Sequence, residues 1–435
     1  MQDKVKIKVA VVAAVQLPNV SDVEFEASLA ELRDLAKTLG FKVARSFTQK
    51  RSAFDAAAYL GTGKREEIRL CVDAAMAGGP DGGRVEAVLV DHEISPSQAR
   101  NLENEVGCEV MDRTMVILDI FHRNARSRAA RAQVEIARLG YMAPRLREMA
   151  KLAGPQGRQR SGTGGRGAGE SHTELDKRKI RDRIAELQQE IAAMDVERKT
   201  QRSRRQERQG LCSVALVGYT NAGKSTLMRA LTGSEVLVED KLFATLDTTV
   251  RALQPESVPR VLVSDTVGFI KNLPHGLVAS FKSTLEEALD AALLLHVIDA
   301  ADPGFQRQLE VTDAVLADIG AAEVPRIRVF NKIDQVGDMA AQVERRAMLQ
   351  AQYPECLVMS AQRPADVALL HHTVVAFFRR DLVEAELFLP WSAQKLRGEI
   401  FSNCEVLEER GDAEGAFLRV RGVPATLQDF AERLA

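Results

Sequence analysis

A glycine-rich loop that ends in lysine and serine is the segment of this chain best suited to chemistry. It spans Gly218–Ser225, reads G-x-x-x-x-G-K-S, and lies between an apolar strand-like run at 211–217 and a helix-like segment that starts at Thr226. Glycines let the backbone close around phosphate groups, and the exposed N–H groups together with the helix N-terminus bind the anion. We expect Lys224 to reach the β- and γ-phosphates and the Ser225 hydroxyl to ligate magnesium.

Two further motifs follow at the ends of apolar, strand-like runs. Asp265–Gly268 reads D-x-x-G, and Asn331–Asp334 reads N-K-x-D. Asp265 can hold magnesium through water, and the amide of Gly268 can sense the γ-phosphate. Asp334 can accept two hydrogen bonds from guanine, at N1–H and the exocyclic amine. Adenine offers neither donor, so a buried carboxylate left unpaired would reject it strongly.

These signals predict a magnesium-dependent GTP-binding domain, and an ATPase with a coincidental N-K-x-D is the alternative. Ser360-Ala361, after an apolar strand, fits the loop that closes over the base. Lys224 and Gly268 are also expected to act in catalysis. The residues expected to contact the nucleotide are Gly218, Asn221, Ala222, Gly223, Lys224, Ser225, Thr226, Asp265, Gly268, Asn331, Lys332, Asp334, Ser360 and Ala361.

A threonine between the first two motifs should complete the magnesium shell and report the γ-phosphate by ordering its loop. The segment from Phe243 to Thr249 contains three threonines. Spacing alone does not choose among Thr245, Thr248 and Thr249.

The position that follows D-x-x-G is Phe269, where GTPases that orient water with a side chain commonly use glutamine. Phenylalanine cannot do this, so we expect slow intrinsic hydrolysis that a partner or an ion must assist. The amide of Asn221 is one candidate, because its oxygen could help to hold a potassium ion near the β- and γ-phosphates. The alternative is that Asn221 only stabilises the loop.

The elements that position these residues suggest an α/β multidomain protein. Residues 1–112 alternate strand-like and helix-like segments, as in a small α/β domain with a mostly parallel sheet. Residues 210–380 should form the doubly wound sheet of the GTPase domain. Residues 381–435 read as a small α+β domain in the order βαββα, with Trp391 and Phe430 expected in its core.

Residues 113–209 are expected to form a long antiparallel helical hairpin around a loop at 154–170 that is rich in glycine and arginine. Its first helix should run from Thr114 to Leu152, with a break or kink at Pro144. The loop contains a match to G-x-G-x-x-G, but a dinucleotide site needs a strand before that motif, and a helix precedes it here.

Composition limits the function classes. The chain has 435 residues, five scattered cysteines and a net charge of −2, with no apolar run long enough to span a membrane. These features favour a cytoplasmic protein. The charge is uneven, since residues 123–208 hold 22 Lys and Arg against 11 Asp and Glu, which leaves 37 basic and 50 acidic residues elsewhere. A basic block between acidic flanks is typical of polyanion binding, and a solvated pair of charged helices is the alternative.

The chain resembles the HflX-type GTPases of the Obg–HflX group. In the GTPase domain the resemblance rests on the segments from Val217 to Thr226, from Phe243 to Asp247 and from Asp265 to Ile270. It extends upstream to Tyr59–Lys64 and to the glycine-rich segment at 164–170.

The resemblance implies that the protein binds the large (50S) ribosomal subunit with GTP and separates stalled or stressed ribosomes. It also implies that hairpin 123–208 inserts its loop toward the peptidyl-transferase region of the ribosomal RNA, and that Thr245 is the magnesium-sensing, catalytic threonine. We expect a monomer that binds GTP and GDP with Mg²⁺. A GTP-gated regulator of another protein and an RNA-binding assembly factor are the alternatives.

Overall fold

The computed structural model describes most of the chain in two compact units. It covers residues 8–76, 84–152, 172–209, 212–233, 242–243, 249–271, 287–380 and 382–434. The first unit contains the described residues up to Ala192 together with Leu242 and Phe243, and the second contains the others. No helix in the described part of the chain is long and apolar enough to cross a membrane. The division into four domains stays a prediction.

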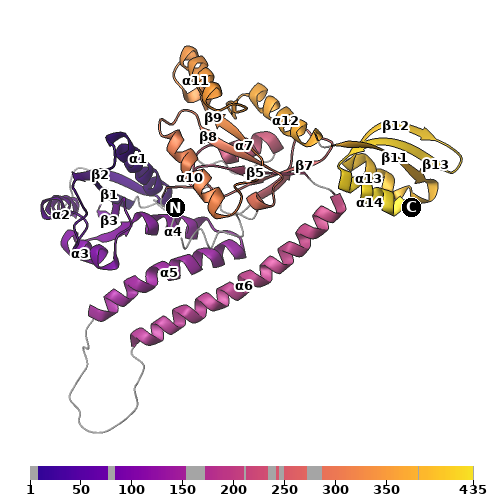
Figure 1. The fold of residues 1–435 in the computed structure, drawn as a ribbon. Helices are drawn as coiled ribbons and strands as arrows, with labels where there is room; N and C mark the ends of the chain where they lie inside the picture. The colour runs from indigo at the N-terminus through magenta and orange to yellow at the C-terminus, as the bar shows by residue number, and fades with distance from the viewer. Residues whose placement is uncertain are drawn as a thin grey trace, which may run out of the picture. The chain divides into compact units, whose positions relative to one another are not determined.

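The first unit contains a four-stranded parallel sheet in the order β2-β1-β3-β4 (Figure 1). Strand β1 is apolar from Val9 to Val15 because it is covered on both faces, and Ala10–Ala14 have no exposed surface. A capping box formed by Ser95 and Gln98 begins α3, with Pro96 in its first turn. The elements are β1 (Lys8–Gln16), α1 (Asp22–Leu39), β2 (Phe41–Lys50), α2 (Thr62–Met76), β3 (Val85–Val90), α3 (Pro96–Val106) and β4 (Glu109–Asp112).

The expected long helix after this sheet is two helices, α4 (Arg113–Asn124) and α5 (Arg128–Leu152). The backbone is extended at Ala125, where α4 ends. The Ser127 hydroxyl then accepts a hydrogen bond from the Ala130 amide and caps the start of α5. The prediction that the break lies at Pro144 was therefore wrong. Pro144 lies inside α5 on its exposed side, where water can bond to the carbonyl that loses its N–H partner.

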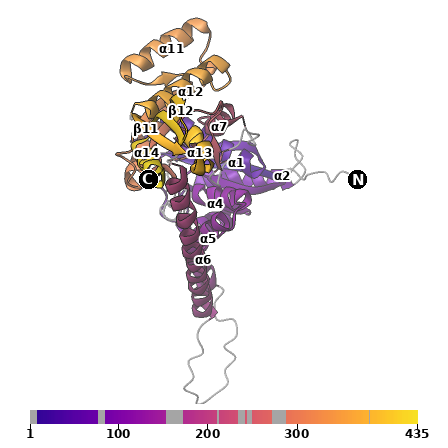
Figure 2. The same ribbon diagram turned by 90° about the vertical axis from the view of Figure 1, so that its right-hand side faces the viewer.

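Within the first unit, helix α5 packs antiparallel to the part of α6 (His172–Gln209) that ends at Ala192, and both views of the ribbon show these helices side by side (Figures 1 and 2). Arg183 donates to Glu135 at 2.9 Å, and further along Arg128 lies 3.8 Å from Glu190. Leu187 is buried in the seam between the helices. Since the paired residue numbers rise on one helix and fall on the other, the helices form the antiparallel hairpin that the sequence predicts.

The second unit contains a six-stranded sheet in the order β10-β9-β8-β5-β7-β6, parallel except for β6. The carboxyl ends of its parallel strands meet at one edge, which is where ligands bind in open α/β sheets. The elements are β5 (Cys212–Val217), α7 (Lys224–Thr232), β6 (Thr249–Ala252), β7 (Val261–Asp265), β8 (Leu293–Asp299), α10 (Phe305–Asp318), β9 (Arg326–Asn331), η1 (Ile333–Gln335), α11 (Met339–Gln352), β10 (Leu357–Val358) and α12 (Pro364–Arg379).

The last part of the chain forms an antiparallel three-stranded sheet in the order β11-β13-β12, and the predicted order βαββα is confirmed. Phe430 lies in its core, as expected. Trp391 does not, because it is 48% exposed. The elements are β11 (Val383–Pro390), η2 (Trp391–Ala393), α13 (Lys395–Asn403), β12 (Glu405–Gly411), β13 (Gly415–Gly422) and α14 (Pro424–Leu434).

Candidate nucleotide-binding site

The loop between β5 and α7 is built so that only glycine fits at two of its positions. Gly218 has a φ of 143°, and a Cβ there would lie 2.2 Å from the carbonyl oxygen of Val297 on β8. Gly223 has a φ of 94°, and a Cβ would lie 2.3 Å from Nδ2 of Asn331. The loop can therefore approach its neighbours and a phosphate group closely because side chains are missing.

Lys224 is buried beneath this loop. Its Nζ donates to the carbonyl oxygens of Gly218 at 3.0 Å and Tyr219 at 2.8 Å. Burial is the main cause that lowers the pKa of Lys224 from 10.5 to about 8; Asp265 opposes this shift, and nearby Lys332 contributes to it. A phosphate group would favour the charged form, so the amine is suited to an anionic ligand.

The pKa of Lys224 predicts how stability changes with pH in the absence of nucleotide. Between pH 8 and 10.5 the unfolded chain keeps a proton that the folded chain has lost, so the free energy of unfolding rises with pH. We expect urea unfolding to show a rise of about 1–3 kcal/mol across this window that is missing in the Lys224→Met variant. Parallel curves for the two proteins would show that burial does not depress this pKa.

Ser225 and Asp265 form the candidate magnesium site. Ser225 Oγ donates to Asp265 Oδ2 at 2.9 Å, and Asp265 is fully buried at the end of β7. Hydroxyl and carboxylate oxygens are the ligands that Mg²⁺ prefers, so this pair fits the ion. Of the candidate threonines, Thr249 is the first residue of β6 and pairs with Asp265. Thr245 and Thr248 lie outside the described residues.

The segment after Asp265 is tied to the glycine-rich loop by backbone hydrogen bonds. The Phe269 amide donates to the Gly218 carbonyl at 3.1 Å, and the Thr220 amide donates to the Phe269 carbonyl at 2.7 Å. A Cβ on Gly268 would lie 2.9 Å from Lys224 Nζ. Because Phe269 is only 2% exposed and carries no polar group, its side chain cannot orient a water molecule.

The hydroxyl of Tyr219 makes a third link that sequence reasoning missed. It accepts a hydrogen bond from the Lys271 amide at 2.7 Å. Position 219 is one of the positions at which the glycine-rich motif allows any residue, so the motif does not predict a role for Tyr219. Asn221 in the same loop has a φ of 58° and an exposed side chain.

The end of the site that should hold the base is organised by Asn331. Its Nδ2 donates to the Ala222 carbonyl at 3.0 Å, and its Oδ1 accepts from the Ala361 amide at 2.9 Å. One side chain therefore joins the phosphate loop to the loop expected to close over the base. Asp334 follows in η1.

Carboxylates outside the motifs hold the other residues that are expected to bind the base. Asp299, at the end of β8, holds Lys332 Nζ at 2.8 Å. Asp366, in the first turn of α12, accepts from the Ser360 amide at 2.9 Å. The position of Asp299 at the end of an apolar, strand-like run could have marked it as a site residue. No sequence pattern in α12 marks Asp366.

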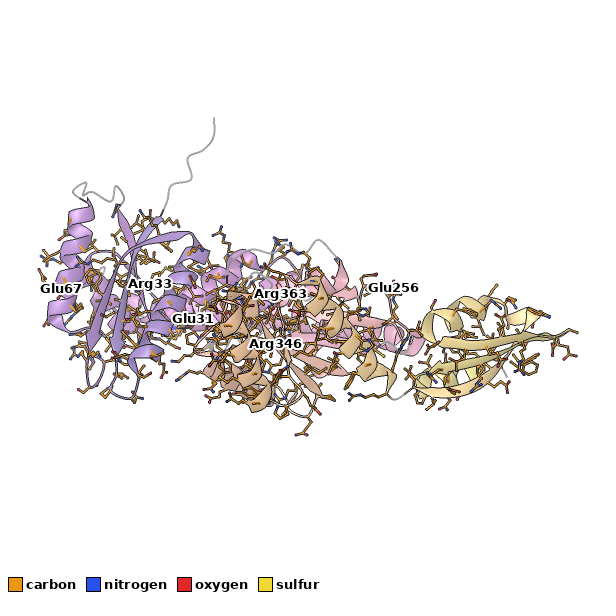
Figure 3. All side chains as sticks on the ribbon, turned by 90° about the horizontal axis from the view of Figure 1, so that it is seen from above. Glu31, Arg33, Glu67, Glu256, Arg346 and Arg363 are labelled. Atoms are coloured by element: carbon orange, nitrogen blue, oxygen red, sulfur yellow. The ribbon has the colours of Figure 1, made fainter. Side chains whose placement is uncertain are left out.

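Two arginines, both labelled in Figure 3, make hydrogen bonds near the loop that contains Ser360 and Ala361. Arg346 lies on α11, and Arg363 is the residue before α12. Arg346 donates to the Val358 carbonyl at 2.6 Å, and Arg363 donates to Gln342 at 2.8 Å.

The structure brings most of the predicted site residues together at one sheet edge, on β5, β7, β9, β10 and the segments that follow them. The predicted residues that it describes there are Gly218, Asn221, Ala222, Gly223, Lys224, Ser225, Thr226, Asp265, Gly268, Asn331, Lys332, Asp334, Ser360 and Ala361. The arginines of the hairpin loop, Arg158, Arg160 and Arg166, lie outside the described residues.

Comparisons with known proteins cover the whole chain. Family models described as GTP-binding GTPase N-terminal, GTP-binding GTPase Middle Region and 50S ribosome-binding GTPase match residues 26–122, 124–205 and 213–332. The GTPase HflX of Gluconacetobacter diazotrophicus is 50% identical over 100% of both chains. The GTPase HflX of Escherichia coli is 38% identical over 90% of this chain and 89% of the relative.

Among solved structures, a GTP-binding protein from Sulfolobus solfataricus in complex with GDP aligns with a TM-score of 0.44 and 23% identity, over 85% of this chain and 99% of that chain. The family assignment rests on the sequence relatives, and the site geometry agrees with it: the glycine-rich loop, a hydrogen-bonded Ser–Asp pair and the loop expected to close over the base meet at one edge of the sheet. The chain therefore belongs to the HflX family of GTPases, enzymes that bind and hydrolyse GTP.

Proposed function

We propose that this GTPase binds the large ribosomal subunit in its GTP-bound form, separates the subunits of stalled or stressed ribosomes, and leaves after hydrolysis. One observation carries the proposal: a nucleotide-binding site and a basic helical hairpin belong to the same chain. Residues 123–208 carry 22 basic and 11 acidic residues, against an acidic excess in the rest. Such an arm suits a partner rich in phosphate, such as ribosomal RNA.

The relatives support the same partner. The family model that matches residues 213–332 is described as a 50S ribosome-binding GTPase. An elongated hairpin is also the shape that can reach into an RNA cavity. Its helices are held in register by the Arg183–Glu135 ion pair at 2.9 Å.

In the proposed cycle, the residues of the site act on the nucleotide by position and charge. Lys224 binds the β- and γ-phosphates, Ser225 and Asp265 hold magnesium, and the Gly268 amide contacts the γ-phosphate. A magnesium ion bound there would neutralise phosphate charge, and Thr245 would be one of the residues that hold it, so the loop around Thr245 would be ordered with GTP and released with GDP.

Binding to purified large subunits tests the proposal. We expect the protein to pellet with 50S subunits in a non-hydrolysable GTP analogue and to stay in the supernatant with GDP. Failure to pellet with either nucleotide would favour the GTP-gated regulator of another protein. Equal pelleting with both, or without nucleotide, would favour an RNA-binding assembly factor.

Asn221 leads to a separate prediction about potassium. Its side chain is exposed in the glycine-rich loop, and the buried, apolar side chain of Phe269 cannot orient water. We propose that the Asn221 amide oxygen helps to hold K⁺ beside the β- and γ-phosphates, where the added charge would stabilise the transition state. GTP hydrolysis should then be about tenfold faster in KCl than in NaCl at equal ionic strength, as expected for about 1.4 kcal/mol of stabilisation.

The Asn221→Ala variant should hydrolyse GTP at the same slow rate in both salts while still binding GDP. Equal rates for the unmodified protein in the two salts would mean that Asn221 only stabilises its loop.

A further inference from the structure

The segment that follows β7 runs beside the glycine-rich loop, and both belong to the second unit. The pairing of β5 with β7 ends at Leu216 and Asp265, and the two segments meet again at a parallel bridge between Tyr219 and Phe269. Three residue steps lead from Leu216 to Tyr219 and four from Asp265 to Phe269, so the second segment holds one extra residue. An extra residue makes the backbone bow out, as in a β-bulge, and this bow contains Gly268.

Hydrogen bonds fix the bow at both of its ends. At the start, Thr266 Oγ1 donates to the Leu216 carbonyl at 2.7 Å, and Thr266 has no exposed surface. At the end, the Phe269 amide donates to the Gly218 carbonyl at 3.1 Å, and the Phe269 carbonyl accepts from the Thr220 amide at 2.7 Å. The residues between these bonds therefore have little freedom to move away from the glycine-rich loop.

Tyr219 adds a side-chain hydrogen bond to this backbone pairing. Its hydroxyl accepts from the Lys271 amide at 2.7 Å, two residues beyond Phe269. Tyr219 is only 8% exposed and Phe269 only 2%, so water competes little for the bond. We call this Tyr219–Lys271 hydrogen bond the tether. It prolongs the contact of the segment with the loop past the last backbone bond between them.

The tethered segment places Gly268 against the lysine of the loop. A Cβ on Gly268 would lie 2.9 Å from Lys224 Nζ and 3.0 Å from the Thr220 Cα. The backbone of Gly268 therefore lies next to the amine that is expected to bind the β- and γ-phosphates.

We propose that Tyr219 is a positioning residue for GTP, because its tether holds the Gly268 amide where the γ-phosphate binds. The inference rests on the proposed role of Gly268 as a γ-phosphate contact. A donor that is already in place loses less conformational freedom on binding than a donor on a free segment. GDP has no γ-phosphate, so the tether should favour GTP over GDP.

The Tyr219→Phe variant removes the hydroxyl and keeps the ring and the backbone hydrogen bonds. We expect the affinity for a non-hydrolysable GTP analogue with magnesium to fall about fivefold, the effect of one lost hydrogen bond, while GDP affinity stays within a factor of about two. In steady-state hydrolysis KM should rise about fivefold, because KM approaches the dissociation constant when the chemical step is slow. A merely structural role would weaken both nucleotides alike, or lower kcat at constant KM.

The matched control is Tyr353→Phe, which deletes the same atom from another partly buried tyrosine of the second unit. The ring of Tyr353 packs against Phe330, with centroids 5.2 Å apart. This variant should change neither affinity. If Tyr219→Phe binds the GTP analogue as tightly as the unmodified protein, or more tightly, or loses affinity equally for both nucleotides, the positioning role is overturned.

Hydrogen exchange in the nucleotide-free protein tests the tether itself. The Lys271 amide should exchange with solvent about fivefold faster in Tyr219→Phe, because its acceptor is gone, while the amides of β7 keep their rates. Equal exchange at Lys271 in the two proteins would contradict the proposal, since the hydroxyl would then not hold the segment.

Gly268→Ala separates a failure of the tether from a failure of the assumed phosphate contact. Its Cβ would collide with Lys224 Nζ, so the affinity for the GTP analogue should fall tenfold or more, on the order of 1.4 kcal/mol, with GDP affinity retained. If Gly268→Ala loses this affinity and Tyr219→Phe does not, only the tether is wrong. If Gly268→Ala binds both nucleotides normally, the assumed role of Gly268 is wrong, and the positioning role of Tyr219 falls with it.

Discussion

Replacing Asp334 with asparagine should lower the affinity for GTP by roughly 10²- to 10³-fold and create affinity for xanthosine triphosphate. The carboxylate is expected to accept two hydrogen bonds from guanine, and an amide would present an N–H donor to at least one of the same positions. Losing charge-assisted hydrogen bonds of this kind costs about 3–4 kcal/mol. Xanthine carries an oxygen where guanine has its exocyclic amine, so the amide N–H can donate to it.

Competition binding with GTP and xanthosine triphosphate measures this change directly. Asp318→Asn is a suitable control, because Asp318 is an exposed carboxylate at the end of α10 and its loss changes the net charge equally. An Asp334→Asn variant that retains GTP affinity and ignores xanthosine triphosphate would show that this residue does not read the base.

Neutralising Arg158, Arg160 and Arg166 to glutamine should weaken binding to the large ribosomal subunit roughly a hundredfold near 0.1 M salt, without changing GTP affinity. Each arginine that neutralises an RNA phosphate releases condensed counterions, so the slope of log affinity against log salt should also become shallower by about two to three. Pelleting titrations with 50S subunits over a range of potassium chloride would give both quantities.

The control for this variant changes the same number of charges elsewhere. Arg397, Arg410 and Arg419 lie on the carboxy-terminal domain and are paired with glutamates at its surface. Their replacement should cost little stability and leave ribosome binding almost unchanged. Equal losses for the two triple variants would indicate dependence on net charge rather than insertion of the hairpin loop.

The grouping of the candidate site at one sheet edge could be predicted because its residues lie in short contiguous motifs at the ends of apolar strands. Gly218 and Gly223 occupy positions where any side chain would collide with a neighbour, and Asn331 joins two loops through both ends of its amide. Buried parallel strands such as β1 and β5 were also evident, since they are continuous apolar runs.

Other features depend on contacts between distant segments, which no local pattern reveals. Tyr219 acts through a hydroxyl that accepts from Lys271, and Asp299 acts through Lys332. The contact between the rings of Phe243 and Phe121 joins positions that are far apart in the sequence. The break between α4 and α5 followed the cap at Ser127 and not the proline, because an exposed proline can stay inside a long helix.

The most direct test of the proposed function is the fate of intact ribosomes. Purified 70S ribosomes would be incubated with the protein and a non-hydrolysable GTP analogue and then separated on a sucrose gradient, with GDP as the control. The account predicts that 70S particles decline in favour of free subunits, and that the protein migrates with the 50S fraction only in the GTP analogue. If 70S particles stay intact and the protein never migrates with 50S subunits, the account is contradicted.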